Sequence, residues 1–271
     1  MPQLSGLFIY PVKSCRGHSV ASAAVDDYGL VDDRRFMIVN LEGHFQHQRI
    51  QPRMALIDTA LTKDSLTLGS PGRGEVSVPR NSPPGAVLTA FVWNDTVEAD
   101  DCGDDAAGWL TEFFGFPARL VRMGEKFHRA VRPGRAQPGD IYSFADGAPF
   151  LITSESSLVE LNERIRRHGG EPVPMNRFRP NLVVAGCAPF AEDTWPRFRL
   201  GGVVFRSVDP CARCVITTTD QRTAARGKEP LRTLATFRRD AHDPTNVNFG
   251  QNLVHETKRG TLRVGDPVEL L

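Results

Sequence analysis

The sequence consists of short apolar runs that glycine and proline interrupt at frequent intervals. Its 271 residues include 24 Gly and 20 Pro, spread along the whole chain. Seven apolar runs of three to five residues are bounded mostly by turn-forming or charged residues, at 7–10, 36–39, 55–57, 182–185, 203–205, 215–219 and 262–264. Runs of this kind are typical of β-strands. We therefore expect an α+β protein that is mostly β.

Three segments have the features of helices. Apolar side chains recur at helical spacing in 106–114 and in 157–167. Ser157 followed by Glu160 forms a capping box at the start of the second segment. Pro230 suits the first turn of a third, short helix, which carries the apolar residues that follow it. The helices are therefore expected to be few and short.

The chain is long enough for two small hydrophobic cores. Its composition does not mark a clean linker, so we place the boundary after the first expected helix, near residue 118. We therefore expect two β-rich domains, at 1–118 and 119–271. The residues at 132–139 are rich in Gly and Pro and predict a loop.

Charge and hydropathy exclude several classes of partner. Lys and Arg together number 33 and Asp and Glu number 32, a balance that argues against nucleic-acid binding. No apolar run is long enough to span a bilayer, and the first residues do not form a signal peptide. Five cysteines, an odd number, indicate a reducing compartment. We therefore expect a cytoplasmic protein that binds neither nucleic acid nor membrane.

Cys211 and Cys214 form the most informative pair in the sequence. They are expected in a tight turn between two strands, where turn amides and the charge of Arg213 can lower the pKa of a thiol. Four interpretations are open: a redox pair, half of a zinc site, two inert thiols, or one thiolate ligand to a metal whose other ligands belong to a cofactor. Taken in isolation, the pair is best read as two inert thiols.

The last of these interpretations requires an anion-binding pocket. Lys13 and Ser14 follow the end of an expected strand, where a cation and a hydroxyl suit a phosphate. Arg34 and Arg179 lie close to the starts of two other strands. The Ser-rich start of the helix near 153–157 could bind an anion on its N-terminal amides. Each feature also has a plainer interpretation: a solvated lysine, surface ion pairs, or simple helix capping.

Taken together, these segments resemble a known family. The matching motifs are short, but their order and spacing cover nearly the whole chain. In the first half they are YPVKS at 10–14, DRRF at 33–36 and QPR at 51–53. In the second half they are DGAP at 146–149, FRPN at 178–181, EDTW at 192–195, CARC at 211–214, TD at 219–220, EPL at 229–231, FGQN at 249–252 and VGDPV at 264–268. The chain resembles MOSC-domain proteins, named after the C-terminal part of molybdenum cofactor sulfurase. It is most similar to the mitochondrial amidoxime reducing components and their bacterial relatives.

The resemblance implies a fold and a cofactor. The fold is a β-barrel-like N-terminal domain over 1–118 followed by a MOSC β-barrel domain over 119–271. The cofactor is molybdenum–molybdopterin, with Cys214 as the catalytic cysteine that binds the metal. The implied contacts of the pterin and phosphate are Lys13, Ser14, Arg34, Ser154, Glu155, Ser157, Arg179, Asn181 and Arg213. The family is also associated with pyridoxal phosphate.

The activity that the resemblance implies is reduction of small N-hydroxylated substrates, namely amidoximes, hydroxylamines and N-hydroxylated bases. No cysteine follows Cys214, so we expect electrons from a separate protein such as a ferredoxin, a flavin reductase or a cytochrome b5-like protein. Asp146 and Glu155 are candidate proton donors. The alternatives are a cofactor or sulfur carrier that uses Cys214 as thiolate or persulfide, and a binding module without metal. The start of the chain lacks the targeting segment of the mitochondrial relatives, in keeping with the cytoplasmic expectation.

Overall fold

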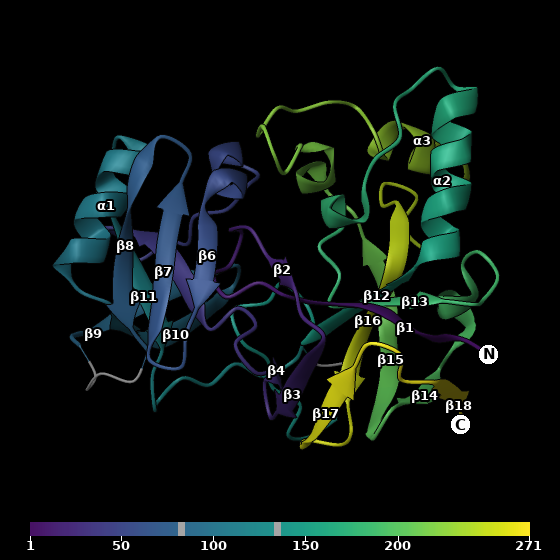
Figure 1. Cartoon of the computed structure of the whole chain (residues 1–271), viewed down its shortest axis with the longest axis horizontal. Coiled ribbons are helices and arrows are strands. Elements are labelled where there is room, and N and C mark those ends of the chain that lie inside the picture. Colours follow the sequence, from purple (N-terminus) through teal and green to yellow (C-terminus); the bar gives the residue numbers. More distant parts are fainter. Residues whose placement is uncertain (81–84, 133–136) are drawn as a thin grey trace.

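The computed structural model describes residues 1–80, 85–132 and 137–271. Within these residues the regular structure is mostly strand, with three α-helices. Figure 1 shows two lobes: a first lobe that contains β6–β11 and α1, and a second lobe that contains β12–β16, β18, α2 and α3. The expected α+β, mostly β fold class is confirmed.

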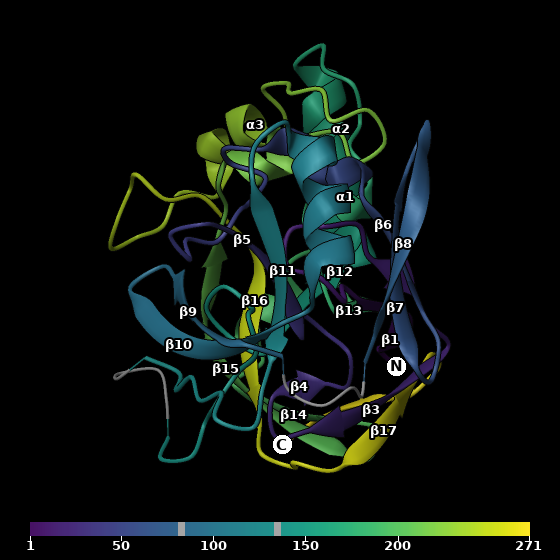
Figure 2. The ribbon, with the colours of Figure 1, turned by 90° about the vertical axis from the view of Figure 1, so that its left-hand side faces the viewer.

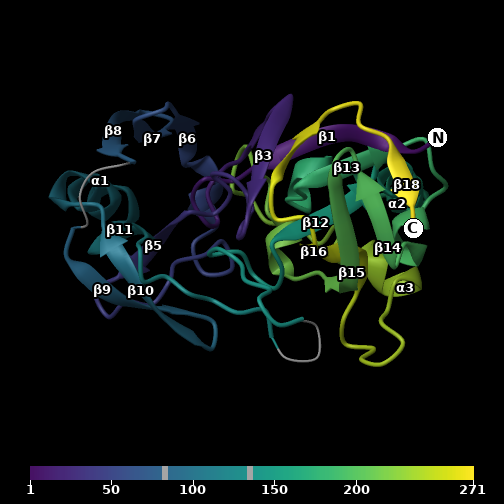
Figure 3. The ribbon, with the colours of Figure 1, turned by 90° about the horizontal axis from the view of Figure 1, so that it is seen from below.

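An eight-stranded sheet forms the second lobe. In order across the sheet, its strands are β18 (Val268–Leu270), β14 (Arg197–Leu200), β15 (Val203–Ala212), β16 (Asn248–His255), β12 (Phe150–Ser154), β13 (Leu182–Ala185), β1 (Gln3–Ile9) and β2 (His18–Ser19). Leu4 and Leu7 of β1 are buried in the core of this lobe with Phe198 and Phe205. The two termini therefore both lie on the second lobe, as Figure 3 shows.

Two smaller sheets form the first lobe. The four-stranded sheet has the order β5 (Phe36–Asn40), β11 (Ala118–Met123), β10 (Asp95–Asp101) and β9 (Val87–Val92). The three-stranded sheet has the order β6 (Asp58–Leu61), β7 (Ser65–Ser70) and β8 (Arg73–Pro79). Helix α1 (Asp104–Phe114) lies along β11 (Figure 2) and buries Leu110 against Ile38, Leu66 and Leu120. The apolar side chains of these strands therefore point into a core that they share with the helix.

A third small sheet joins residues from the two ends of the chain. It has the order β17 (Gly260–Arg263), β3 (Ser22–Asp26) and β4 (Gly29–Leu30). Together with β1, it brings the N-terminal segment against the second lobe before the chain enters the first lobe (Figure 1). The division into 1–118 and 119–271 stays a prediction.

The three expected helices are present, and two of them begin earlier than the pattern predicts. Helix α1 starts at Asp104, because two aspartates occupy the first turn, where carboxylates favour the helix dipole. Helix α2 (Glu155–Arg167) starts two residues before Ser157, because the side chain of Ser154 caps it. Helix α3 (Leu231–Phe237) follows Pro230 as predicted.

Five of the seven expected strands are confirmed, and two are wrong. Residues 55–57 belong mostly to a 3-10 helix, η1 (Pro52–Leu56), because Pro52 favours the first turn of a helix. Residues 215–218 form another, η4 (Val215–Thr218), in which the hydroxyls of Thr217 and Thr218 donate to the carbonyls of Cys214 and Val215. Such local hydrogen bonds compete with a strand. The loop expected over 132–139 includes 133–136, which lie outside the described residues.

Candidate functional site

A cavity of about 470 Å³ opens where the two lobes meet. Its walls come from the loops after β1 and before β5, from the β9–β10 turn, and from the second-lobe segments that lead into or out of β12, β13, β15 and η4. The cations that line it are Lys13, Arg34, Arg49, Arg132, Arg179 and Arg213, against the carboxylates Asp146 and Asp209. The excess of cations makes the cavity suited to an anionic ligand.

Arg34 and Arg179, which are 145 residues apart in the sequence, meet at the ring of Tyr10. Their guanidinium carbons lie 4.5 Å and 4.3 Å from the ring centroid. The buried Tyr10 hydroxyl donates to the carbonyl of Pro180 at 3.1 Å. Burial raises the pKa of Tyr10 to about 12, although both arginines oppose this. Tyr10 therefore stays protonated and holds the two guanidinium groups by cation–π contact.

The backbone is strained around the cavity. Ser14, Arg34, Trp93 and Arg179 all line it and all have positive φ, between 51° and 66°. Side chains other than glycine rarely adopt this conformation, and such residues cluster at functional sites. Asp33 supports the strained turn before β5, because its carboxylate accepts from the Tyr10 amide and from Arg34 Nη1.

Two buried guanidinium donors in this cavity lack a hydrogen-bond partner among the described residues. They are Nη2 of Arg179 and Nε of Arg213. Another donor of each group is used: Arg179 Nη1 donates to the carbonyl of Cys15 at 2.7 Å, and Arg213 Nη2 to that of Phe178 at 2.5 Å. Buried polar groups are nearly always paired. The unpaired donors therefore indicate a ligand that brings acceptors, such as phosphate or carbonyl oxygens.

Lys13 and Asp146 form an ion pair at the cavity. Lys13 Nζ donates to Oδ1 of Asp146 at 2.5 Å and to the carbonyl of Phe144 at 2.7 Å, and Trp93 Nε1 donates to the same carboxylate oxygen. Burial lowers the pKa of Lys13 to about 8, although Asp146 opposes this. Desolvation would raise the pKa of Asp146, but Lys13 holds it well below its usual range. Asp146 is therefore ionised and does not fit the expected role of proton donor.

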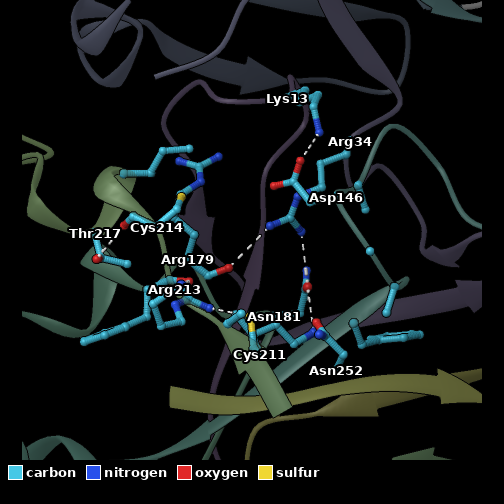
Figure 4. A pocket seen from close by; sticks show the side chains of 18 of the residues that line it. Lys13, Arg34, Asp146, Arg179, Asn181, Cys211, Arg213, Cys214, Thr217 and Asn252 are labelled. Atoms are coloured by element: carbon cyan, nitrogen blue, oxygen red, sulfur yellow. Dashed lines mark hydrogen bonds and ion pairs between the residues drawn. The ribbon is translucent and has the colours of Figure 1, made fainter. Parts of the chain in front are cut away.

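The two cysteines of the 211–214 motif differ in position. Cys211 lies near the end of β15 and its Sγ accepts from Arg213 Nη1 at 2.7 Å. Burial raises the pKa of the Cys211 thiol, and Arg213 opposes this. Cys214 lies at the start of η4 and lines the cavity. Figure 4 shows Cys214 on one side of the pocket and Lys13, Arg34 and Asp146 on the other. The pair is not in a turn between two strands, because a 3-10 helix follows it.

The structure brings seven of the expected site residues into this cavity: Lys13, Ser14, Arg34, Arg179, Asn181, Arg213 and Cys214. Asn181 contributes partly through its neighbours, because its Oδ1 accepts from Arg34 Nη1 and from the amide of Leu151. The seven come from both lobes and from sequence positions more than 200 residues apart. The sequence placed them together only through the family resemblance.

Ser154, Glu155 and Ser157 are not among the residues that line the cavity. Ser154 and Ser157 are fully buried, and their hydroxyls lie 2.6 Å apart. Oε1 of Glu192 accepts from the amide of Ser154 and from the hydroxyl of Ser157. A carboxyl group of the protein therefore takes the place at the start of α2 that we expected an external anion to occupy. Burial raises the pKa of Glu192, and Ser157 opposes this.

Several residues that form or support the cavity wall were not expected from the sequence. Tyr10 and Asp33 lie inside the quoted motifs, but nothing in the sequence indicated their supporting roles. Trp93 lies in the β9–β10 turn, and Asn252 lies in β16. Asn252 lies in the FGQN motif at 249–252, but nothing in the sequence assigned it to the cavity, and Trp93 has no sequence signal. Only the tertiary fold brings the hairpin and the strand to the same cavity.

Two family models match the chain. The MOSC N-terminal beta barrel domain matches residues 1–117, and the MOSC domain matches residues 139–269. These matches define the class: a MOSC domain preceded by its N-terminal barrel.

The chain is also similar, over nearly its whole length, to curated proteins. It is 38% identical to mitochondrial amidoxime-reducing component 1 of Homo sapiens and 36% identical to that of Mus musculus. It is 36% identical to mitochondrial amidoxime reducing component 2 of Rattus norvegicus. These alignments cover 98% of this chain and 82%, 81% and 82% of the relatives. The chain therefore belongs to the family of MOSC-domain proteins that includes the amidoxime-reducing components.

The relatives contradict one expectation. All three are named as mitochondrial proteins, so the cytoplasmic location expected from the sequence is wrong. Cysteine usage reports a reducing environment and does not identify the compartment that provides it. In the described part of the chain, no helix is both long and apolar enough to cross a membrane. The association with pyridoxal phosphate stays a prediction.

Proposed function

We propose that this protein reduces small N-hydroxylated compounds with a molybdenum–molybdopterin cofactor held between its lobes. Family membership supports the proposal, as do the names of the relatives, which describe amidoxime reduction. The observation that carries it is one cavity that combines Cys214 with buried guanidinium donors that have no partner among the described residues.

The residues of the cavity fit this cofactor. A thiolate is a soft ligand of the kind that sulfur-seeking metals prefer, and Cys214 is the one we assign to molybdenum. Arg179 and Arg213 have buried donors available for phosphate or pterin oxygens. Lys13, Ser14 and Arg34 line the same cavity and complete the cationic wall.

When bound, the cofactor supplies the two-electron chemistry that removes oxygen from nitrogen. The chain positions the reactants around it. Tyr10 and Asp33 fix the guanidinium groups of Arg34 and Arg179, so that little reorganisation is needed when an anion binds. The side chain of Asp146 is 67% exposed at the cavity and ionised, so it can accept a hydrogen bond from the N–H or O–H of a substrate.

The reaction also needs a source of electrons. Conversion of an N–OH group to N–H consumes two electrons and two protons and releases one water. We propose that a separate electron-transfer protein delivers the electrons, of the ferredoxin, flavin-reductase or cytochrome b5-like kind expected from the sequence.

The test is molybdenum content together with turnover. Protein produced in a host that makes the cofactor is analysed for molybdenum per chain and assayed with an aromatic amidoxime and a chemically reduced viologen dye. Near-stoichiometric molybdenum and amidine formation support the proposal. Molybdenum without turnover favours the cofactor-carrier alternative, and persulfide labelling on Cys214 then tests sulfur transfer. The absence of molybdenum from wild-type protein contradicts both.

A further inference from the structure

A buried pair of glutamine side chains joins the two lobes beside the cavity. Gln48 and Gln221 are 173 residues apart, and they are 0% and 5% exposed. Nε2 of Gln221 donates to Oε1 of Gln48 at 2.9 Å, and Nε2 of Gln48 donates to Oε1 of Gln221 at 3.1 Å. The two amides therefore form a closed, reciprocal pair.

The second N–H of each amide is also used. Gln48 Nε2 donates to the carbonyl of Ser14 at 2.8 Å, and Gln221 Nε2 donates to the carbonyl of Thr219 at 3.1 Å. Rotation of either amide by 180° would set an oxygen against an oxygen and an N–H against an N–H. One arrangement alone satisfies all four N–H groups. A buried network that is fully satisfied is rigid and specific.

The pair connects the two segments that we assign to the cofactor. Ser14 lies in the cavity wall next to Lys13 and has a φ of 66°. Thr219 is the last residue of the turn that begins at Cys214, because Cys214 and Thr219 cap the two ends of η4. The chain of contacts therefore runs from the cationic loop, through the two glutamines, to the turn that carries the cysteine.

Two arginines hold the backbone of the same glutamines. Arg16 Nη2 donates to the carbonyl of Gln221 at 3.0 Å. Arg226 Nη2 donates to the carbonyls of Gln48 and Arg49 at 2.6 Å and 2.7 Å. Arg226 thereby joins the segment after η4 to the chain after β5. Arg16, which also pairs with Asp58 of β6 at 2.7 Å, joins the β1–β2 loop to Gln221. The amide pair thus lies at the centre of a set of contacts between the lobes.

We infer that Gln48 and Gln221 are positioning residues, which fix the loop of Lys13 and Ser14 relative to the turn of Cys214. The inference rests on the proposed function in one respect: these two segments are taken to hold opposite ends of the cofactor. The glutamines do not touch the cofactor. They act through the carbonyls of Ser14 and Thr219, and their loss is expected to loosen both segments together.

The first measurement is hydrogen exchange on cofactor-free protein. Gln221→Leu leaves the carbonyl of Thr219 and Oε1 of Gln48 without these donors, and leaves Nε2 of Gln48 bonded to the carbonyl of Ser14 alone. Gln221→Glu keeps the shape but replaces the N–H donors by a carboxyl oxygen and adds an ionisable group. Val97→Ala, in the buried core around β9 and β10 of the first lobe, is the control for lost stability. We expect exchange at residues 14–16 and 214–219 to rise by about tenfold in both Gln221 variants and to stay near wild type in the control. If Gln221→Leu does not fold, exchange at residues 14–16 and 214–219 in Gln221→Glu tests the inference.

The second measurement is the rate at which cofactor-loaded protein loses molybdenum on dialysis. We expect loss to be about tenfold faster in the Gln221 variants than in Val97→Ala. Unchanged exchange, or a rise at only one of the two segments, overturns the inference, because the pair then does not couple them. Wild-type protein without molybdenum overturns the proposed function instead, and the exchange result still decides whether the glutamines position the two segments.

Discussion

At the scale of single residues, the environment separates the two cysteines of the 211–214 motif. The Cys211 thiol is buried against Arg213, which donates to its sulfur, and burial raises its pKa. Cys214 begins a 3-10 turn and lines the cavity, with Thr217 donating through both its amide and its hydroxyl to the Cys214 carbonyl. The turn therefore fixes the backbone of Cys214 and leaves its thiol to face the cavity.

Replacement of each cysteine tests this difference. Cys214→Ala is expected to lower molybdenum per chain and to reduce amidoxime turnover by more than about 100-fold, because the metal loses its protein ligand. Cys211→Ala is expected to retain the metal. Elemental analysis and the viologen assay measure both. Retention of metal in Cys214→Ala and its loss in Cys211→Ala would reverse our assignment of the ligand.

His255 predicts a pH dependence of stability. It is fully buried in β16, its Nε2 lies 2.6 Å from the carbonyl of Asp26, and burial lowers its pKa to about 4. An unfolded histidine takes up a proton near pH 6.5, whereas the folded one stays neutral. The free energy of unfolding should therefore fall as the pH drops from about 6.5 to about 4, by up to roughly 3 kcal/mol.

Denaturant unfolding of wild type and of His255→Gln over this range tests the prediction. Glutamine keeps a donor for the carbonyl of Asp26 and does not titrate, so the variant should lose less stability than wild type between pH 7 and pH 4. Parallel losses in the two proteins would show that other groups cause the pH dependence.

At the scale of secondary structure, the start of helix α2 shows how a plain structural role can look like a binding site. Ser154 caps the helix, and Ser157 donates to Glu192 while it accepts from the amide of Phe190. These contacts use the polar groups that an anion would otherwise need. The serines therefore stabilise the junction between α2 and the 3-10 helix η3 (Ala191–Thr194).

We predict that these serines matter for stability and not for the metal. Ser154→Ala should cost about 1 kcal/mol through the lost cap. Ser157→Ala should cost roughly 1–3 kcal/mol, because the buried Glu192 carboxyl loses one of its two donors and the part-buried amide of Phe190 loses its acceptor. Denaturant unfolding measures both costs, and molybdenum per chain should match wild type. A loss of molybdenum at unchanged stability would instead support the role in cofactor binding that the family resemblance implied.

The same scale shows where sequence patterns succeed and fail. The runs at 36–39 and 182–185 predict strands correctly, because β-branched and aromatic side chains there pack on both faces of a sheet. The run at 215–219 has equally strong β character but folds as η4. Its threonine hydroxyls find acceptors on the preceding turn, and this choice depends on tertiary burial that the residue pattern does not contain.

At the scale of the whole molecule, the first strands of the chain lie in the second lobe, before the chain enters the first lobe. The sequence predicts a strand at 7–10, but apolar periodicity does not name the neighbour of a strand. In the structure β1 lies between β13 and β2, and β3 pairs with β17. The contact of Arg34 and Arg179 with the ring of Tyr10 likewise joins segments that are far apart in the sequence. Contacts between distant segments were accessible from the sequence only through resemblance to known proteins.

The position of β1 gives a prediction about how the molecule unfolds. Leu7 is fully buried in the core of the second lobe, although it lies near the N-terminus. Leu7→Ala should therefore destabilise the second lobe, by about 2–5 kcal/mol for a buried leucine. Native-state hydrogen exchange should accelerate in β12 and β13 and stay near wild type in β10 and β11.

Leu120→Ala is the matched control, because Leu120 is equally buried in the core of the first lobe. It should accelerate exchange in β10 and β11 rather than in β12 and β13. If Leu7→Ala accelerates exchange in the first lobe instead, residues 1–118 unfold as one unit in spite of the pairing of β1 with β13. If Leu7→Ala accelerates exchange in the second lobe alone, β1 unfolds together with the eight-stranded sheet. That sheet carries the Cys214 side of the cavity.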